Sequence, residues 1–178
     1  MNRGILVRII NFVAFALGLV SVGLFLFFAF GPFETNNVYL GLIMLSTAIP
    51  HLVIFLVGRC FKDAFKIVDF VFMIISIVLG IVFISVPAIS VEIMVLIWAS
   101  FDIIRGIYHA FNSVVELKHN KLEIIELACD ATEIIFSIIL IFEKAEGITM
   151  HLVVMASTTI VLIVKFIIDF VKFRFNLI

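Results

Sequence analysis

The sequence predicts an all-α polytopic membrane protein, a bundle of six transmembrane helices. The first observation is composition: of 178 residues, 65% are hydrophobic and only 14% are charged, whereas soluble domains are about 45–50% apolar and about 25% charged. Mean hydropathy is +1.35, and a soluble fold of 20.0 kDa has too much surface to hide that much apolar side chain. Residues 1–178 are therefore expected to form a single integral membrane domain.

The second observation is six apolar runs, each near the roughly 20 residues that a helix needs to cross the hydrocarbon core. Helices are expected because lipid offers the backbone no hydrogen-bond partners, and these runs lack the alternation of barrel strands. The break at Pro87 is the shortest, so the two helices that flank it should form a tight hairpin. The runs lie at about 8–31, 38–58, 67–87, 90–112, 122–142 and 149–171.

Basic residues predict the orientation. Between successive runs they alternate strictly between the two sides, and Lys144 alone lies on the minority side. By the positive-inside rule, both termini are expected to be cytoplasmic, in a multi-pass protein of the cell membrane. The nine residues on the majority side are Arg3, Arg8, Arg59, Lys62, Lys66, Lys118, Lys121, Lys172 and Arg174.

The six runs also predict a three-fold internal repeat. Ser21 and Ser76 each precede a proline by eleven residues, and Ser137 has apolar neighbours similar to those of Ser76. In the second run of each pair, serines stand at matching places, Ser46, Ser100 and Ser157. Each unit leaves the cytoplasm and returns to it, so the repeats should be parallel helical hairpins. Their ranges are about 8–58, 67–112 and 122–171.

The middle hairpin carries a family resemblance. Residues 77–87 (IVLGIVFISVP) and 96–111 (LIWASFDIIRGIYHAF) are similar to the HdeD family, the DUF308 short-repeat membrane proteins. The resemblance implies a small bacterial inner-membrane protein associated with acid resistance. It implies no chemistry that can be assigned residue by residue.

Charged residues inside the spans are the main functional signal, because charge is costly in lipid. Helical spacing puts them on inward faces, and those expected near the middle of the bilayer are Asp102, Arg105, Asp130, Glu133 and Lys165. Arg105 suits a carboxylate of the fifth helix, and Lys165 is expected to pair with Asp130 or Glu133. One carboxylate remains in excess. Because a low dielectric disfavours its charged form, the network is expected to respond to protons; the alternative is a static network that specifies helix pairing.

A second set of polar residues accompanies this network, namely Asp69, His51, His109, Glu126 and Asp169. His51 is expected to form an interhelical hydrogen bond, and His109 to lie near the membrane interface. The four histidines lack the spacing of a zinc site, and the two cysteines suit neither a disulfide nor a metal, so no metal site is expected.

The remaining features exclude several functional classes. A net charge of -1 provides no basic arm for nucleic acid. The sequence lacks GxSxG, HExxH, P-loop and dinucleotide-binding motifs, so we expect no enzyme, no catalytic residue and no cofactor. The resemblance favours an HdeD-type stress protein. The alternatives are a channel, a transporter or the substrate-binding subunit of a vitamin importer, and a non-catalytic membrane scaffold. Expected partners are the lipid bilayer and, in a homo-oligomer, further copies of the chain; a small-molecule ligand is left undetermined.

Overall fold

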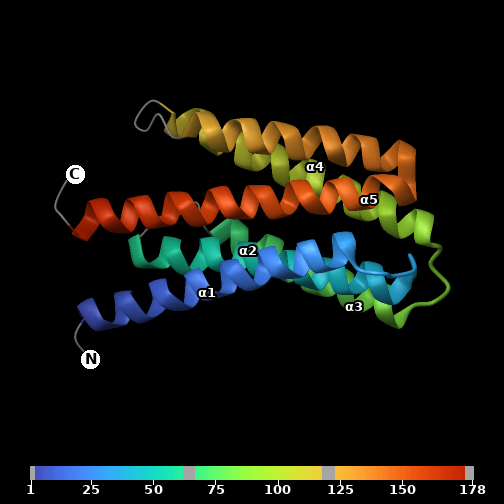
Figure 1. Ribbon diagram of the computed structural model, residues 1–178, viewed down its shortest axis with the longest axis horizontal. Coiled ribbons are helices and arrows are strands. Elements are labelled where there is room, and N and C mark those ends of the chain that lie inside the picture. Colours follow the sequence, from blue (N-terminus) through green and yellow to red (C-terminus); the bar gives the residue numbers. More distant parts are fainter. Residues whose placement is uncertain (1–2, 62–66, 118–122, 175–178) are drawn as a thin grey trace.

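The computed structural model describes residues 3–61, 67–117 and 123–174. Within those ranges every regular element is a helix, which confirms the predicted all-α class. The elements are α1 (Arg3–Phe30), α2 (Asn37–Phe61), α3 (Ile67–Ser85), α4 (Val91–Glu116) and α5 (Glu123–Arg174) (Figure 1).

The 52-residue α5 contains both the fifth and the sixth predicted helices. Asp102 and Arg105 are one turn apart in α4, yet Asp102 contacts His151 and Arg105 contacts Glu133. In a straight helix, eighteen residues would separate Glu133 from His151 by about 27 Å. The helix must therefore fold back, and Figure 1 shows its red second half returning antiparallel to its orange first half. The break expected at 143–147 has helical backbone, and its side chains lie outside those that the structure describes.

The helices run back and forth between two ends of the bundle (Figure 1). The terminal end holds the start of α1 and the end of α5, together with the ends of α2 and α4. The turn end holds the connection 31–36, the connection 86–90 and the reversal of α5. The basic residues that predict the orientation are assigned by sequence to the terminal end; their side chains lie outside the described set, as does that of Lys144.

Local capping explains where two helices begin. The Asn36 side chain accepts a hydrogen bond from the Tyr39 backbone N–H at 2.9 Å, and the Ser90 hydroxyl accepts one from Ile93 N–H at 3.4 Å. Each satisfies a donor that the first turn of a helix leaves without a partner. The Asn37 amide then donates to the carbonyl of Ile89 at 3.3 Å, which ties the two connections of the turn end together.

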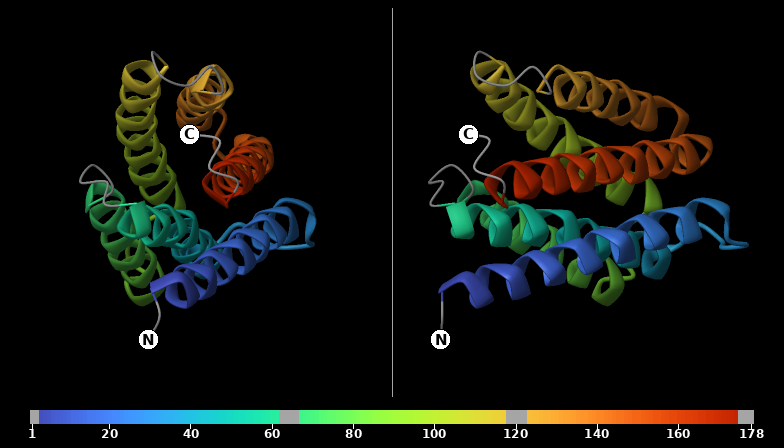
Figure 2. Two further views of the ribbon diagram at one scale, coloured as in Figure 1. Left: turned by 90° about the vertical axis from the view of Figure 1, so that its left-hand side faces the viewer. Right: turned by 60° about the vertical axis from the view of Figure 1, so that its left-hand side comes forward.

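Helix neighbours are set by small residues. α2 packs on α3, where a Cβ built at Gly80 would meet the Gly41 carbonyl oxygen at 2.9 Å and one at Gly41 would meet the Gly80 oxygen at 2.8 Å. Close backbone approach through small residues is the usual form of helix contact in membranes. At Gly18 of α1 a Cβ would meet Ile163 of the second half of α5 at 2.8 Å. Figure 2 shows the resulting bundle from its end and obliquely.

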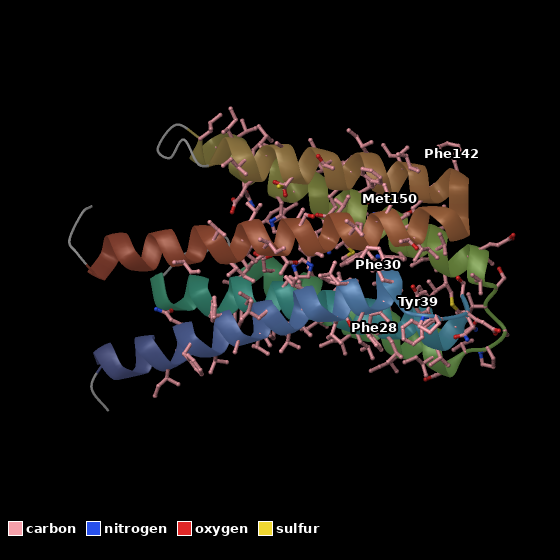
Figure 3. The ribbon with its side chains drawn as sticks, viewed as in Figure 1. Phe28, Phe30, Tyr39, Phe142 and Met150 are labelled. Atoms are coloured by element: carbon pink, nitrogen blue, oxygen red, sulfur yellow. The ribbon has the colours of Figure 1, made fainter. Side chains whose placement is uncertain are left out.

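The distribution of side chains is the reverse of that in a soluble protein. Large apolar side chains cover the outside: Phe12, Phe30 and Phe142 are 73%, 72% and 78% exposed (Figure 3 labels the last two). Charged groups lie inside, with Asp102 and Arg105 only 0% and 4% exposed. Water would penalise such a surface and lipid would not, so this arrangement fits a membrane protein.

Three helices are long and apolar enough to cross a membrane among the residues described, namely Ile9–Phe30, Asn37–Leu56 and Ile67–Ser85. A shorter apolar stretch, Ile148–Val164, lies in the second half of α5. The number of crossings stays a prediction. In α4 and the first half of α5, Asp102, Arg105 and Glu133 are buried and Glu126 and Asp130 are partly buried, whereas Glu92 is exposed.

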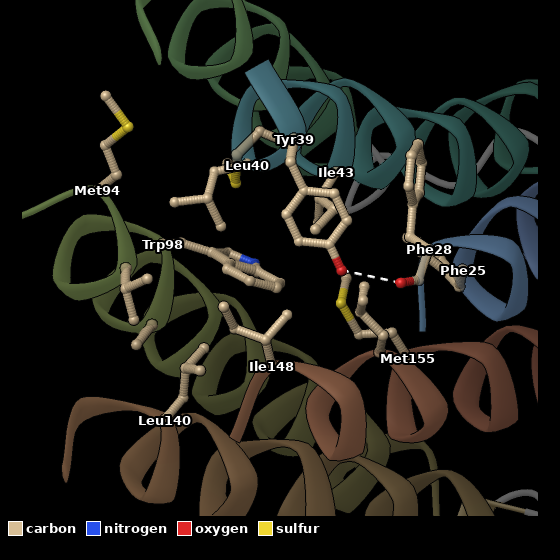
Figure 4. Close-up of a cluster of buried hydrophobic side chains, with 14 of the residues drawn as sticks. Phe25, Phe28, Tyr39, Leu40, Ile43, Met94, Trp98, Leu140, Ile148 and Met155 are labelled. Atoms are coloured by element: carbon tan, nitrogen blue, oxygen red, sulfur yellow. Dashed lines mark hydrogen bonds between the residues drawn. The ribbon is translucent and has the colours of Figure 1, made fainter. Parts of the chain in front are cut away.

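An apolar core fills the turn end of the bundle (Figure 4). Trp98 of α4 is fully buried and packs with residues of α2 and α5, including Leu40 and Ile148. The Tyr39 hydroxyl donates to the carbonyl of Phe28 at 2.8 Å, the dashed line in Figure 4, and so joins α2 to α1. This core fixes the helices against one another directly beside the buried charges.

Candidate functional site: a buried polar cluster

The cluster is centred on one face of α4. Asp102 and Arg105 are three residues apart, so their side chains lie on the same side of the helix. Arg105 Nη1 lies 3.3 Å from Asp102 Oδ1, and both side chains are buried. A buried charge is tolerated only when it is paired, and here the guanidinium of Arg105 and the carboxylate of Asp102 balance each other.

The first half of α5 supplies the second carboxylate. Glu133 is 5% exposed, and its Oε1 contacts Nη2 of Arg105. This is the contact between Arg105 and a carboxylate of the fifth predicted helix that the sequence indicates. Gly106 lets the two helices approach, since a Cβ there would meet Cγ1 of Ile134 at 2.7 Å.

The second half of α5 supplies a histidine that the sequence analysis missed. His151 is fully buried, and its Nε2 lies 2.8 Å from Asp102 Oδ2. Its ring meets that of Trp98 edge to face at 5.0 Å. A signal existed: His151 precedes Thr158 by seven residues and Lys165 by fourteen, so it continues their stripe toward the turn end. We call Asp102, Arg105, Glu133 and His151 the arginine cluster.

A second group lies beside the arginine cluster. His51 Nδ1 of α2 lies 3.3 Å from Asp69 Oδ1 of α3, and His109 Nε2 of α4 lies 3.4 Å from the same oxygen. His51 and Asp69 are buried, and the His109 side chain is 22% exposed. The expected interhelical contact of His51 is present. His109 belongs to the same group, and its expected place near the membrane interface stays a prediction. We call these three residues the His–Asp–His group.

Arg105 joins the two groups, with its Nη1 3.5 Å from His51 Nε2. Arginine only donates hydrogen bonds, so His51 Nε2 must be the accepting nitrogen in this arrangement. The proton of a neutral His51 is then on Nδ1, from which it is directed at Asp69. A single chain of polar contacts thus runs from His109 through Asp69, His51 and Arg105 to the arginine cluster.

The other predicted residues lie elsewhere or outside the described set. Asp130 is partly buried and accepts a hydrogen bond from Ser113 Oγ at 3.1 Å. Ser113 is about 12 Å along α4 from Arg105, so Asp130 is placed nearer the terminal end than the arginine cluster. Glu126 is partly buried one further turn in that direction. The side chains of Lys165 and Asp169 are outside those that the structure describes, so the predicted pairing of Lys165 stays a prediction.

Carboxylates outnumber guanidinium groups among the residues brought together here. Asp102 and Glu133 share Arg105, while Asp69 contacts His51 and His109. Three ligand atoms of the His–Asp–His group lie within 4.8 Å of one another, close enough for one metal ion. The spacing of residues along the chain does not predict this arrangement, because the three residues come from three different helices.

Residues 71–142 match the family model described as a short repeat of unknown function (DUF308). The matched part runs from α3 through α4 into the first half of α5, and it includes the middle hairpin from which the resemblance was identified. It contains Asp102, Arg105, His109 and Glu133. No curated protein and no solved structure matches the chain.

Proposed function

We propose that the chain is a multi-pass membrane protein of the HdeD type that responds to acid through its arginine cluster. The proposed topology has six crossings and cytoplasmic termini, and the DUF308 match supports the family assignment. One observation carries the functional part of the proposal. Two buried carboxylates, Asp102 and Glu133, converge on the single guanidinium of Arg105, with His151 bonded to Asp102.

The proposed topology includes three parallel hairpin repeats, and burial supports it. Ser21, Ser76 and Ser137 occupy matching places in the three units, and each is 0% exposed. The units also contact one another in rotation: α2 of the first packs on α3 of the second, α4 on the first half of α5, and the second half of α5 on α1. The serines at matching places in the second helices behave differently, since Ser46 is buried and Ser100 and Ser157 are exposed.

The proton response follows from the charge of the arginine cluster. With His151 neutral, the cluster carries one negative charge in excess, which a proton on His151 or on a carboxylate would cancel. The charged and titratable groups that face it are His51 from α2, Asp69 behind His51, Asp102 and Arg105 of α4, and Glu133 and His151 of α5. Uptake of that proton as the pH falls should therefore stabilise the folded bundle.

The sign and size of the effect can be stated. When the folded state binds more protons than the unfolded state, the free energy of unfolding falls as pH rises. One proton corresponds to a slope of at most about 1.4 kcal/mol per pH unit. The wild-type protein in detergent should thus have a higher melting temperature at pH 6 than at pH 8. In Glu133→Gln the remaining Asp102 and Arg105 charges balance, so the difference should shrink.

The matched control is Glu34→Gln, which makes the same change in an exposed residue of the connection between α1 and α2. It should keep the wild-type pH dependence. A Glu133→Gln variant whose melting temperature changes with pH as the wild type does would leave a static scaffold as the better interpretation.

The link to acid resistance needs a separate assay. Bacteria that express the wild-type chain should survive an acid shift better than bacteria that express Glu133→Gln at the same level. Proton flux into liposomes that contain either protein separates the transport alternative from a sensor. A wild-type flux that Glu133→Gln abolishes favours a conducting pathway, and equal survival of the two strains contradicts the proposed role in acid resistance.

A further inference from the structure

The His–Asp–His group brings three potential metal ligands together. Its two nitrogen-to-oxygen distances are 3.3 and 3.4 Å, both to Oδ1 of Asp69. A tetrahedral ion with nitrogen and oxygen ligands at about 2.0–2.2 Å holds those ligand atoms about 3.3–3.6 Å apart, so these two distances match edges of such a tetrahedron. All three ligand atoms lie within 4.8 Å of one another, and a small movement of the side chains would close them around one ion.

The surroundings hold the ligand side chains in place. The rings of His51 and His109 are stacked, with centroids 6.0 Å apart and planes 13° apart. Phe72, one turn after Asp69 on α3, contacts both rings at 5.5 and 6.2 Å. Three helices thus present one ligand each around an aromatic support. The His109 side chain is 22% exposed, so the group is less deeply buried on the side of α4 than at His51 and Asp69.

Charge favours a divalent cation at this place. Asp69 supplies one carboxylate to the group, and an anionic ligand strengthens the binding of a divalent cation. Two imidazoles and one carboxylate suit first-row transition metals such as zinc, whereas calcium and magnesium prefer oxygen ligands alone.

From this geometry we propose that His51, Asp69 and His109 bind one divalent transition-metal ion between α2, α3 and α4. His51 would bind through Nδ1, so its ring proton must move to Nε2. Nε2 can then no longer accept from Arg105, whose guanidinium keeps its contacts with Asp102 and Glu133. The proposal does not depend on the proposed acid response, because it concerns a different set of side chains and is tested at one fixed pH.

The test uses cobalt(II) as the probe, because a tetrahedral cobalt site absorbs visible light. The full chain, purified in detergent and treated with a chelator, is titrated with cobalt chloride at neutral pH, and zinc chloride is then added. We expect tetrahedral absorption bands that saturate at one equivalent and disappear as zinc displaces cobalt.

Two variants and one control locate the site. His109→Gln and Asp69→Asn should each weaken cobalt binding by more than about tenfold, since even partners of metal ligands contribute about 10–100-fold to affinity. His109 is the safer position, because a substitution at a partly exposed residue disturbs the fold less than one at a buried residue. Circular dichroism and elution volume check that the variant is folded. Glu34→Gln removes an exposed carboxylate outside the group and should bind cobalt as the wild type does.

Two results would overturn the assignment. One is a wild-type protein that shows no tetrahedral cobalt spectrum in a large excess of the metal. The other is a folded His109→Gln variant that binds cobalt as tightly as the wild type, which would place any bound ion elsewhere. Loss of binding in Glu34→Gln as well would mean that binding does not depend on this group in particular.

Discussion

Removing the guanidinium of Arg105 is the most direct perturbation of the cluster. The side chain is 4% exposed and is the common partner of Asp102 and Glu133, with His51 at the edge of hydrogen-bond distance. Arg105→Ala would leave two carboxylates without this cation inside the bundle. Breaking a buried ion pair from one side costs about 3–5 kcal/mol, and we expect a loss of stability of that size.

The expected loss is large enough to measure by thermal unfolding in detergent. For chains of this length, about 1 kcal/mol corresponds to about 2–4 °C in melting temperature, so Arg105→Ala should melt about 6–20 °C lower. Ile104→Ala is the matched control. Ile104 is the adjacent residue on α4 and is 62% exposed, so its truncation should leave the melting temperature nearly unchanged.

A double variant identifies the cause. If the loss arises from unpaired carboxylates, adding Glu133→Gln to Arg105→Ala should recover part of it, because one buried charge disappears. Additive losses would show that the two residues do not act on each other. An Arg105→Ala protein with the same melting temperature as the wild type would refute the reasoning, since the guanidinium would then contribute nothing to the stability of a buried network.

Two further predictions concern helix packing. Gly80→Val should destabilise the protein by about 1–3 kcal/mol, because the added atoms meet the Gly41 carbonyl and Leu45 where α2 touches α3. Gly23→Ala is the control and should be tolerated, since nothing lies within 4 Å of the added carbon. Equal melting temperatures of the two variants would contradict the close contact at Gly80. Tyr39→Phe removes the 2.8 Å hydrogen bond to the Phe28 carbonyl but keeps the ring contacts with Phe28 and Phe33. Thermal unfolding should therefore show a loss of stability of about 1 kcal/mol. A larger loss than that of Gly80→Val would show that this hydrogen bond matters more than the α2–α3 contact.

Local rules account for what the sequence predicted correctly. A residue's place on a helical face follows from the helix period, so Asp102 and Arg105 were expected on one face. The high cost of charge in lipid predicted that they would face inward. The contact of Arg105 with Glu133 followed from those two rules together with the neighbouring positions of their helices.

Other parts of the site depended on relations between helices that no local pattern contains. The hydrogen bond between Asp130 and Ser113 of α4 was not expected from the sequence, and the depth of Asp130 in the bilayer stays a prediction. The sequence did not indicate that Asp69 of α3 lies 3.4 Å from His109 of α4. His151 was overlooked because the reversal of α5, rather than its own sequence neighbours, carries it to Asp102.

The amino-acid sequence alone determined that this chain is helical, that its exterior suits lipid, and that its charges gather inside, because each of these follows from composition and from a period of 3.6 residues. Only the tertiary structure decided which charges meet. Partners such as His51 and Asp69 depend on the rotation and vertical shift of one helix against the next. That rotation and shift are set by close contacts between residues far apart along the chain, such as the contact between Gly41 and Gly80.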